Sequence, residues 1–163
     1  MSYLVDGNNV MAQHVGWHRD KPGARRILMD QLAEFARLKH AHVDVVFDGA
    51  PEPYFADGST YRGIKIYYAE RGSNADERIK RFVDAARERK TLLVVTSDRE
   101  LGTYARRCGV QVIRSGDFRR RMEEAAAAEV ASPNDDRIVK HEEMPDWMRY
   151  FGVDPEDDNG NDG

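Results

Sequence analysis

Three aspartates in this sequence each stand at the end of a short apolar run. Asp6 follows Tyr-Leu-Val, Asp48 follows Val-Asp-Val-Val-Phe, and Asp98 follows Leu-Leu-Val-Val-Thr-Ser. If these runs are parallel strands, the three carboxylates lie at the carboxyl edge of one sheet, which is where open α/β sheets bind their ligands. Asp-Gly is also a common turn pair that both Asp6-Gly7 and Asp48-Gly49 match, so solvent-facing turn aspartates are the alternative explanation.

A fourth aspartate, Asp76, lies in the segment GSNADERI at 72–79, where the pattern predicts the start of a helix. Ser73 or Asn74 as the N-cap, with acidic residues in the first turn, would account for this segment without any site. A helix that follows a parallel strand begins at the same edge of the sheet, however. We therefore expect Asp76 to point toward the other three carboxylates.

Four carboxylates at one place repel one another and raise their own pKa values unless a cation neutralises them. Oxygen ligands without cysteine or suitably spaced histidine select a hard cation, Mg²⁺ or Mn²⁺, rather than zinc. Such a metal lowers the pKa of its bound water and stabilises charge on a phosphate, so the predicted chemistry is phosphoryl transfer to water. The predicted metal ligands are Asp6, Asp48, Asp76 and Asp98.

Neighbouring polar residues extend the predicted site. Asn8 and Asn9 offer neutral oxygen acceptors and NH₂ donors, and Gly7 lets the backbone approach closely. The predicted catalytic residues are Asp6, Asn8, Asp76 and Asp98. The candidates for binding a phosphodiester substrate are Asn9, Arg62, Arg71, Ser97, Arg99, Arg119 and Arg120. For each arginine a solvated surface position is the simpler explanation, and turn formation explains Ser97 equally well.

The chain has 163 residues, of which 40% are hydrophobic, and this is enough for one core. No segment has the apolar length needed to cross a bilayer, so we expect a cytoplasmic protein without membrane contact. The sequence has 25 Lys and Arg and 29 Asp and Glu. Residues 1–130 contain 22 of the basic and 19 of the acidic residues, whereas residues 131–163 contain 3 basic and 10 acidic residues. A mildly basic body suits a polyanionic substrate.

Short apolar runs alternate with amphipathic stretches along the chain, which is the pattern of a parallel α/β sheet. The expected strands are residues 3–5, 43–47, 64–68, 92–95 and 110–113. Apolar residues at helical spacing predict helices at 22–39, around 75–86, around 99–108, and from Ser115 to about 130. Residues 49–62 have the composition of a loop. The only cysteine, Cys108, is expected to be a buried thiol at a helix end, outside any disulfide framework.

The C-terminal part of the chain differs from the body in composition. Residues 1–130 form the predicted domain, and the composition of residues 131–142 predicts a linker. Within 143–152, four apolar residues recur at helical spacing and predict a short amphipathic helix that docks on the body or on a partner. The acidic segment 153–163 is expected to be disordered.

Four motifs of the chain resemble the NYN domain of the YacP-like nucleases, a branch of the PIN-like fold. They are VDGNNVM at 5–11, VVFDG at 45–49, GSNADERI at 72–79 and VVTSDREL at 94–101. The resemblance covers roughly residues 1–130 and implies a Rossmann-like domain with a metal-dependent ribonuclease site. It makes Asp6, Asp76 and Asp98 the metal site, with Asn8 and Asp48 in support. The chain departs from many relatives, which carry an aromatic residue where Asn8 stands.

The resemblance implies endoribonuclease activity on RNA and, for some members, association with the ribosome. The expected function is therefore metal-dependent hydrolysis of RNA phosphodiester bonds. An alternative is a catalytically silent RNA- or ribosome-binding module of the same fold. A small-molecule phosphohydrolase would need a lysine near the phosphate, which no late strand supplies, and a DNA flap nuclease would need additional helices.

Overall fold

Six strands form one sheet in the computed structural model, which describes residues 1–69 and 73–131. The strands are β1 (Ser2–Asp6), β2 (His42–Asp48), β3 (Ser59–Tyr61), β4 (Ile64–Ala69), β5 (Leu92–Val95) and β6 (Gln111–Ile113). Their order across the sheet is β3-β4-β2-β1-β5-β6, and all pairs are parallel except β3 with β4. The predicted α/β fold with a central parallel sheet is confirmed.

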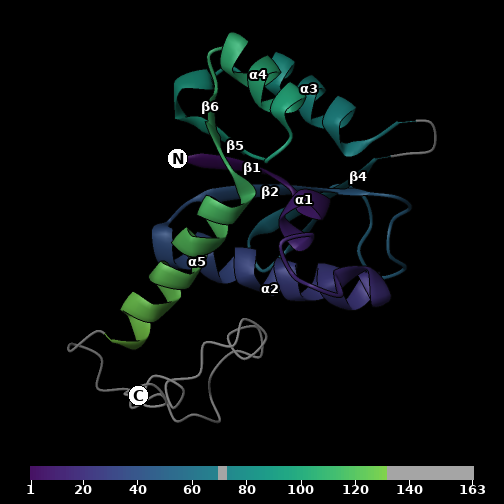
Figure 1. Ribbon diagram of the computed structural model, residues 1–163, viewed down its shortest axis with the longest axis vertical. Coiled ribbons are helices and arrows are strands. Elements are labelled where there is room, and N and C mark those ends of the chain that lie inside the picture. The colour runs from purple at the N-terminus through teal and green to yellow at the C-terminus, as the bar shows by residue number, and fades with distance from the viewer. Residues whose placement is uncertain (70–72, 132–163) are drawn as a thin grey trace.

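Helices cover both faces of this sheet (Figure 1). The α-helices are α1 (Gly7–Met11), α2 (Lys21–Lys39), α3 (Ala75–Ala85), α4 (Arg99–Arg107) and α5 (Ser115–Val130), and the 3₁₀ turns are η1 (Trp17–Arg19) and η2 (Arg89–Thr91). Figure 1 shows α3 and α4 on one face, with α1, α2 and α5 on the other. Among the described residues, no helix is both long and apolar enough to cross a membrane.

Two apolar cores, one on each face, explain why the central strands are almost continuously hydrophobic. Val5 and Phe47 pack toward α2 and α5, whereas Leu4 and Val46 pack toward α3 and α4. Side chains alternate between the faces of a strand, so a strand covered on both faces must be apolar at every position. This arrangement leaves only the ends of the strands for polar chemistry.

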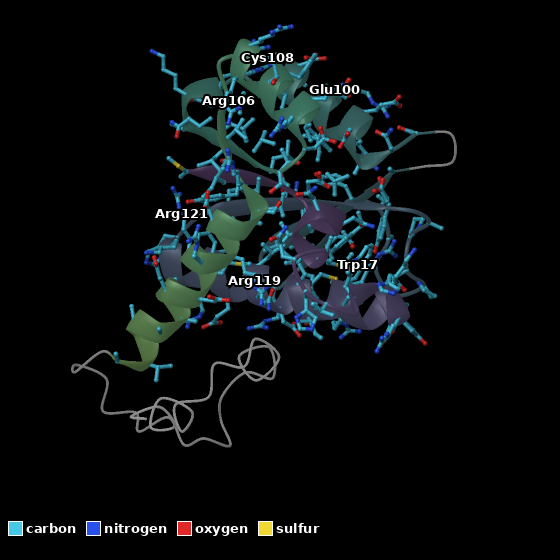
Figure 2. The ribbon with its side chains drawn as sticks, viewed as in Figure 1. Trp17, Glu100, Arg106, Cys108, Arg119 and Arg121 are labelled. Carbon is cyan, nitrogen blue, oxygen red and sulfur yellow. The ribbon has the colours of Figure 1, made fainter. Side chains whose placement is uncertain are left out.

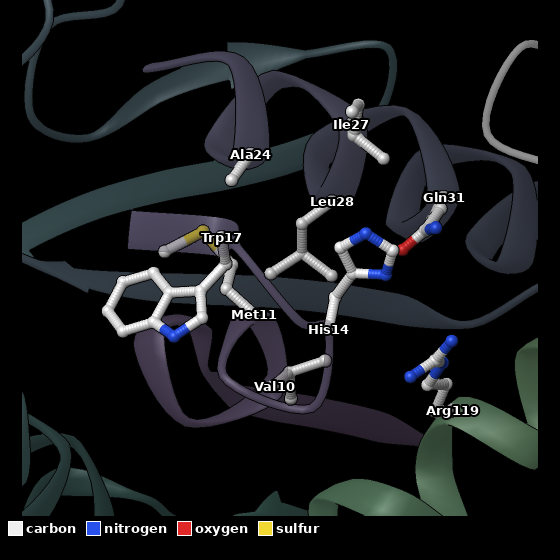
Figure 3. Close-up of a pocket in the computed structure, with 9 residues that line it drawn as sticks. All are labelled: Val10, Met11, His14, Trp17, Ala24, Ile27, Leu28, Gln31 and Arg119. Carbon is white, nitrogen blue, oxygen red and sulfur yellow. The ribbon is translucent and has the colours of Figure 1, made fainter. Parts of the chain in front are cut away.

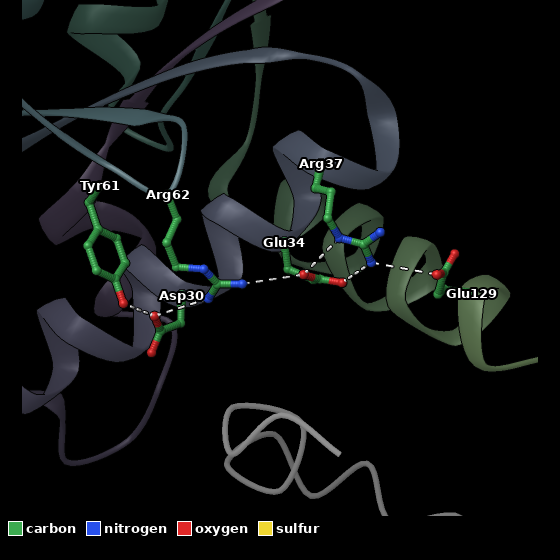
Figure 4. Close-up of polar contacts among 6 residues, drawn as sticks. All are labelled: Asp30, Glu34, Arg37, Tyr61, Arg62 and Glu129. Atoms are coloured by element: carbon green, nitrogen blue, oxygen red, sulfur yellow. Dashed lines mark hydrogen bonds and ion pairs between the residues drawn. The ribbon is translucent and has the colours of Figure 1, made fainter. Parts of the chain in front are cut away.

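The segment predicted as a loop at 49–62 contains an additional strand, so that prediction was wrong in part. β3 pairs with β4 through a two-residue turn in which Arg62 has φ 46° and Gly63 has φ 90°. Positive φ at both turn positions matches the twist of a tight hairpin. Asn-Gly or Asp-Gly usually marks such a turn, and the Arg-Gly sequence here hid it. Ion pairs from Arg62 to Asp30 (3.5 Å) and Glu34 (3.7 Å) hold the turn on α2 (Figure 4).

The Asp-Gly-Asn-Asn segment after β1 turns directly into the short helix α1. Gly7 is the first residue of this helix and is buried. A Cβ at this position would lie 2.6 Å from the ring of Phe47 and 3.0 Å from Val45. Gly7 therefore permits a close approach, as expected, but the approach is to the β2 side chains beneath the site.

Replacing Gly7 with alanine is expected to lower the free energy of unfolding by about 1–3 kcal/mol, because the added methyl group overpacks a buried ring. Gly102→Ala is the matched control: its Cβ would meet no atom closer than 3.6 Å, and alanine is the better helix former. Urea denaturation of the two variants measures the difference. Equal stabilities would contradict the packing argument.

The remaining element boundaries follow local signals in the sequence. Pro22 lies in the first turn of α2, and Gly109, at φ 83°, follows the end of α4, as predicted. Cys108 caps α4 but is half-buried, so the expectation of a fully buried thiol was wrong. The predicted linker, amphipathic helix and acidic tail, after residue 131, lie outside the described residues.

Candidate active site at the carboxyl edge of the sheet

The chain changes direction across the sheet between β1 and β5. From β1 it proceeds outward to β2 and β4, and it then returns to add β5 and β6 on the other side of β1. The carboxyl ends of two such diverging strands leave a crevice, which is the usual ligand site of an open α/β sheet. Asp6 ends β1, and Thr96 follows β5 directly, so these two residues flank the crevice.

Asp6 is the most deeply buried carboxyl group at this edge, with 4% of its surface exposed. Thr96 Oγ1 donates a hydrogen bond to Asp6 Oδ2 at 3.0 Å. Burial raises the pKa of Asp6 to about 7, and the negative charges of Asp76 and Asp48 raise it as well, while the Thr96 hydrogen bond opposes the change. The carboxyl group is thus held where its charge is poorly solvated.

Asp76 and Asp98 approach each other from the first turn of α3 and the N-cap of α4. Burial raises the pKa of Asp76 to about 6, with contributions from repulsion by Asp98 and from a hydrogen bond that protonated Asp76 donates to Asp98. Asp48 adds further repulsion. Asp76 therefore interacts electrostatically with each of the other three predicted acids.

Three of these carboxylates also accept hydrogen bonds from the protein. Asp48 Oδ1 accepts from the backbone N–H of Ala75 at 2.7 Å, and Asp98 Oδ1 accepts from that of Leu101 at 3.0 Å. Across residues 1–69 and 73–131, no three His, Cys, Asp or Glu side chains form a metal-holding group. A carboxylate has two oxygens and about four acceptor positions, so each capping aspartate keeps capacity for another partner.

Asn8 and Asn9 connect the strand ends to one another. Asn8 Oδ1 accepts from the backbone N–H of Asp48 at 3.0 Å. Asn9 Oδ1 accepts from the backbone N–H of Ser97 at 2.8 Å and from Ser115 Oγ at 2.5 Å. The carbonyl oxygens of both amides, predicted to face a ligand, are used to fix the ends of β2 and β5 relative to β1.

Arg25 on α2 holds the loop that follows Asp48. Its guanidinium donates to the carbonyl oxygens of Asp48 and Ala50 and pairs with Glu52 at 2.8 Å. The group stacks over Phe47 (5.4 Å) and is 9% exposed. Backbone contacts on both sides of Gly49 fix where Asp48 leaves its strand.

We expect Arg25→Met to lower the free energy of unfolding by roughly 1–3 kcal/mol, because it leaves Glu52 and two carbonyl groups without their donor. Adding Glu52→Gln to this variant removes the unpaired charge and should recover part of the loss. Urea denaturation of both single variants and the double variant measures the coupling. Strictly additive changes would show that the two side chains do not interact.

The other predicted substrate residues fall into two groups. Ser97 and Arg99 are exposed at the carboxyl edge, on either side of Asp98. Arg119 is half-buried on α5, donates to the carbonyl oxygen of Gln13 at 2.9 Å and points toward α1 and α2 (Figure 2). Arg120 is exposed and paired with Asp117 in the first turn of α5. Only the first group stands beside the acids.

Arg62 is not brought to this edge. It lies in the β3–β4 turn at the amino end of β4, where it pairs with α2. Figure 4 shows it within a network that continues through Glu34 and Arg37 to Glu129 of α5. A substrate role for Arg62 therefore stays a prediction, and it would require RNA to reach the end of β4 that is opposite the acids. Arg71 lies outside the described residues.

Sequence reasoning missed three residues that organise the site. Thr96 bonds Asp6 and also accepts from the backbone N–H of Asp98 at 3.1 Å. Ser115 joins α5 to Asn9, and Arg25 holds the β2 loop. Thr96 carried a signal, because it directly follows the apolar run and precedes Ser-Asp. The other two lie far along the chain from their partners and gave none.

The fold and the acidic residues at the carboxyl edge of its sheet define a class of protein. It is a Rossmann-like α/β domain with aspartates near the crevice between β1 and β5. The family model described as the YacP-like NYN domain matches residues 3–147, so this chain belongs to the YacP-like NYN family, which is nuclease-like. The resemblance drawn from the four motifs is thereby confirmed. The match continues beyond residue 130, where the sequence pattern placed the end of the domain.

Solved structures of Rae1 (YacP) from Bacillus subtilis have the same fold. One is a crystal structure at 22% identity and a TM-score of 0.62, covering 79% of this chain and 77% of that chain. Another, of a single-substitution mutant, has 20% identity and a TM-score of 0.65, covering 82% and 85%. No curated protein matches the sequence.

Proposed function

We propose that this protein is a metal-dependent endoribonuclease that hydrolyses RNA phosphodiester bonds at the carboxyl edge of its sheet. The observation that carries the proposal is that Asp76 lies close enough to Asp6, Asp48 and Asp98 to repel each of them, although these acids come from the ends of β1 and β2 and the starts of α3 and α4. Membership of a nuclease-like family supports it. Bringing several carboxylates together in the folded protein costs free energy unless a cation or a proton compensates their charge. Such a cluster therefore indicates a functional site.

The donor types at this edge would suit a hard dication, although no three of them among the described residues stand close enough together to form a metal-holding group in this structure. The donors are carboxylate oxygens without a thiol, which favours Mg²⁺ or Mn²⁺. The raised pKa values of Asp6 and Asp76 reflect burial and repulsion that the Thr96 hydrogen bond and Lys80 offset only in part. Asp6, Asp76 and Asp98 would hold the metal, with Asp48 beside them. A bound ion of this kind would activate water and stabilise charge on the phosphate.

The chain's own groups have separate tasks in this proposal. Thr96 orients Asp6 by its hydroxyl group, and Asn8 and Asn9 keep the strand ends in register. The backbone contacts of Arg25 hold Asp48 in place. Arg99 is exposed beside Asp98 and, of the predicted arginines that the structure describes, is the best placed to contact a substrate phosphate. The ribosome is a proposed context for the RNA substrate.

Incubation of a labelled single-stranded RNA with the protein tests the proposal. Internal cleavage that needs Mn²⁺ or Mg²⁺ and stops with EDTA is the expected result. The alternative, a silent RNA-binding module, predicts retention of the RNA without cleavage at any metal concentration. That outcome would overturn the nuclease while leaving the fold and family unchanged.

A further inference from the structure

A hollow of about 360 Å³ lies between the start of α2 and the loop that joins β2 to β3. Its lining includes Pro22, Arg26, Met29, Glu52, Tyr54 and Phe55. This volume is at the lower end of the range for small-molecule sites. By contrast, the cavity among His14, Trp17 and Arg119 in Figure 3 measures about 20 Å³, which leaves room for about one water molecule.

The hollow adjoins the acidic edge. Glu52 in its wall is four residues from Asp48, a stretch of chain that spans at most roughly 14 Å. Arg25, which also lines the hollow, bonds both the carbonyl oxygen of Asp48 and the carboxylate of Glu52. A polymer whose backbone passes the acids can therefore extend into the hollow.

The lining has the chemistry that unpaired nucleobases bind. Tyr54 is 88% exposed, and it is the only aromatic among the large hydrophobic residues that stand out as exposed in the described chain. Arg26 is exposed and lies over the ring of Phe55 at 4.7 Å. Bases of single strands stack on aromatic rings and on arginine planes, and a cation beside them attracts the phosphates.

The loop is stiffened before any ligand arrives. Pro51 and Pro53 fix φ on both sides of Glu52, and an isolated antiparallel bridge joins Glu52 to Phe55. Phe55 packs edge-on against Tyr61 at 5.3 Å, which anchors the loop to β3. The backbone that carries Tyr54 therefore has little conformational entropy to lose on binding.

We propose that this hollow is a subsite for one unpaired nucleobase of the RNA strand, which stacks on Tyr54 while Arg26 contacts the adjoining phosphate. The inference rests on the proposed function, because that function is what brings the RNA strand to the acids beside the hollow. It adds a substrate class: RNA that is single-stranded beside the cut. A base inside a duplex cannot stack on Tyr54, because both of its faces are already covered by neighbouring base pairs.

Binding of a labelled single-stranded oligoribonucleotide in EDTA, followed by fluorescence anisotropy, tests the subsite without requiring cleavage. Tyr54→Leu keeps an apolar side chain but removes the ring, and its Kd should rise about 5- to 100-fold. Tyr54→Phe keeps the ring and should bind like the wild type. Arg26→Gln should weaken binding more than Arg107→Gln, its charge-matched control at the far end of α4.

Photo-crosslinking of an oligonucleotide that contains 4-thiouridine, mapped by mass spectrometry, shows directly which residues contact the bound base. The expected crosslink falls on residues 53–55. Three outcomes would each overturn the subsite: an unchanged Kd for Tyr54→Leu, equal affinity for duplex and single-stranded RNA, or crosslinks only outside residues 53–55. The hollow would then bind another class of partner. Ring-dependent binding without any metal-dependent cleavage would support the subsite and overturn the nuclease, so the two failures are distinguishable.

Discussion

Asp6→Asn is expected to abolish metal-dependent cleavage and, at the same time, to stabilise the metal-free protein. A carboxyl group whose pKa is higher in the folded chain than in the unfolded chain binds more protons when folded. Its contribution to the free energy of unfolding is therefore largest at low pH and is lost as pH rises toward the folded pKa. For Asp6 the pKa rises from 3.8 to about 7, so the loss falls between about pH 4 and pH 7.

The stabilisation by Asp6→Asn should grow by roughly 2–3 kcal/mol between pH 5 and pH 8, because asparagine carries no charge to bury. Urea denaturation in EDTA at the two pH values measures this difference. Asp44→Asn is the control for cleavage, since Asp44 lies within β2 beside His42, away from the edge. A pH-independent effect at Asp6 would mean that its carboxyl group is not held at a raised pKa.

Asp76→Asn is expected to reduce RNA cleavage by about 10²-fold or more, because a metal ligand contributes several kcal/mol of charge stabilisation in the transition state. Repulsion from Asp98 and Asp48 identifies Asp76 as part of the acidic group. The measurement is the initial rate of cleavage of a single-stranded RNA at saturating Mn²⁺.

Glu77→Gln is the matched control for that experiment. Glu77 occupies the same first turn of α3 and contributes the same charge at the helix N-terminus, but its carboxylate accepts from Ser73 Oγ at 3.1 Å. Its removal should leave cleavage close to the wild-type rate. Equal losses for Asp76→Asn and Glu77→Gln would indicate a general effect of charge at the helix start rather than a metal ligand.

The sequence predicted the parts of this molecule that depend on short-range patterns. The five parallel strands contain short apolar runs, and the buried residues of α2 recur at helical spacing, so both patterns predicted their elements directly. Asp6 and Asp48 lie at the carboxyl ends of parallel strands, and such strands present their carboxyl ends at one edge of the sheet. The role of these aspartates as metal ligands stays a prediction. The helix caps at Asn74 and Asp98 also follow local rules.

What escaped prediction depends on partners that are distant in sequence. Asn9 lies 106 residues from Ser115, and Arg25 lies 23 residues from Asp48. Neither pair shares a motif, so only the fold shows that the polar groups meet. The position of Arg62 was also not predictable, because the Arg-Gly turn concealed a hairpin that carries the chain back to the amino end of β4.

A titration of the metal-free protein with Mn²⁺ at pH 8, with free ion followed by its electron paramagnetic resonance signal, is the most direct test of a metal site at this edge. Saturable uptake by the wild type and by Asp44→Asn, lost in Asp6→Asn and Asp76→Asn, is the result that the proposed site predicts. Absence of saturable uptake by the wild type, or undiminished uptake by Asp6→Asn, would contradict it.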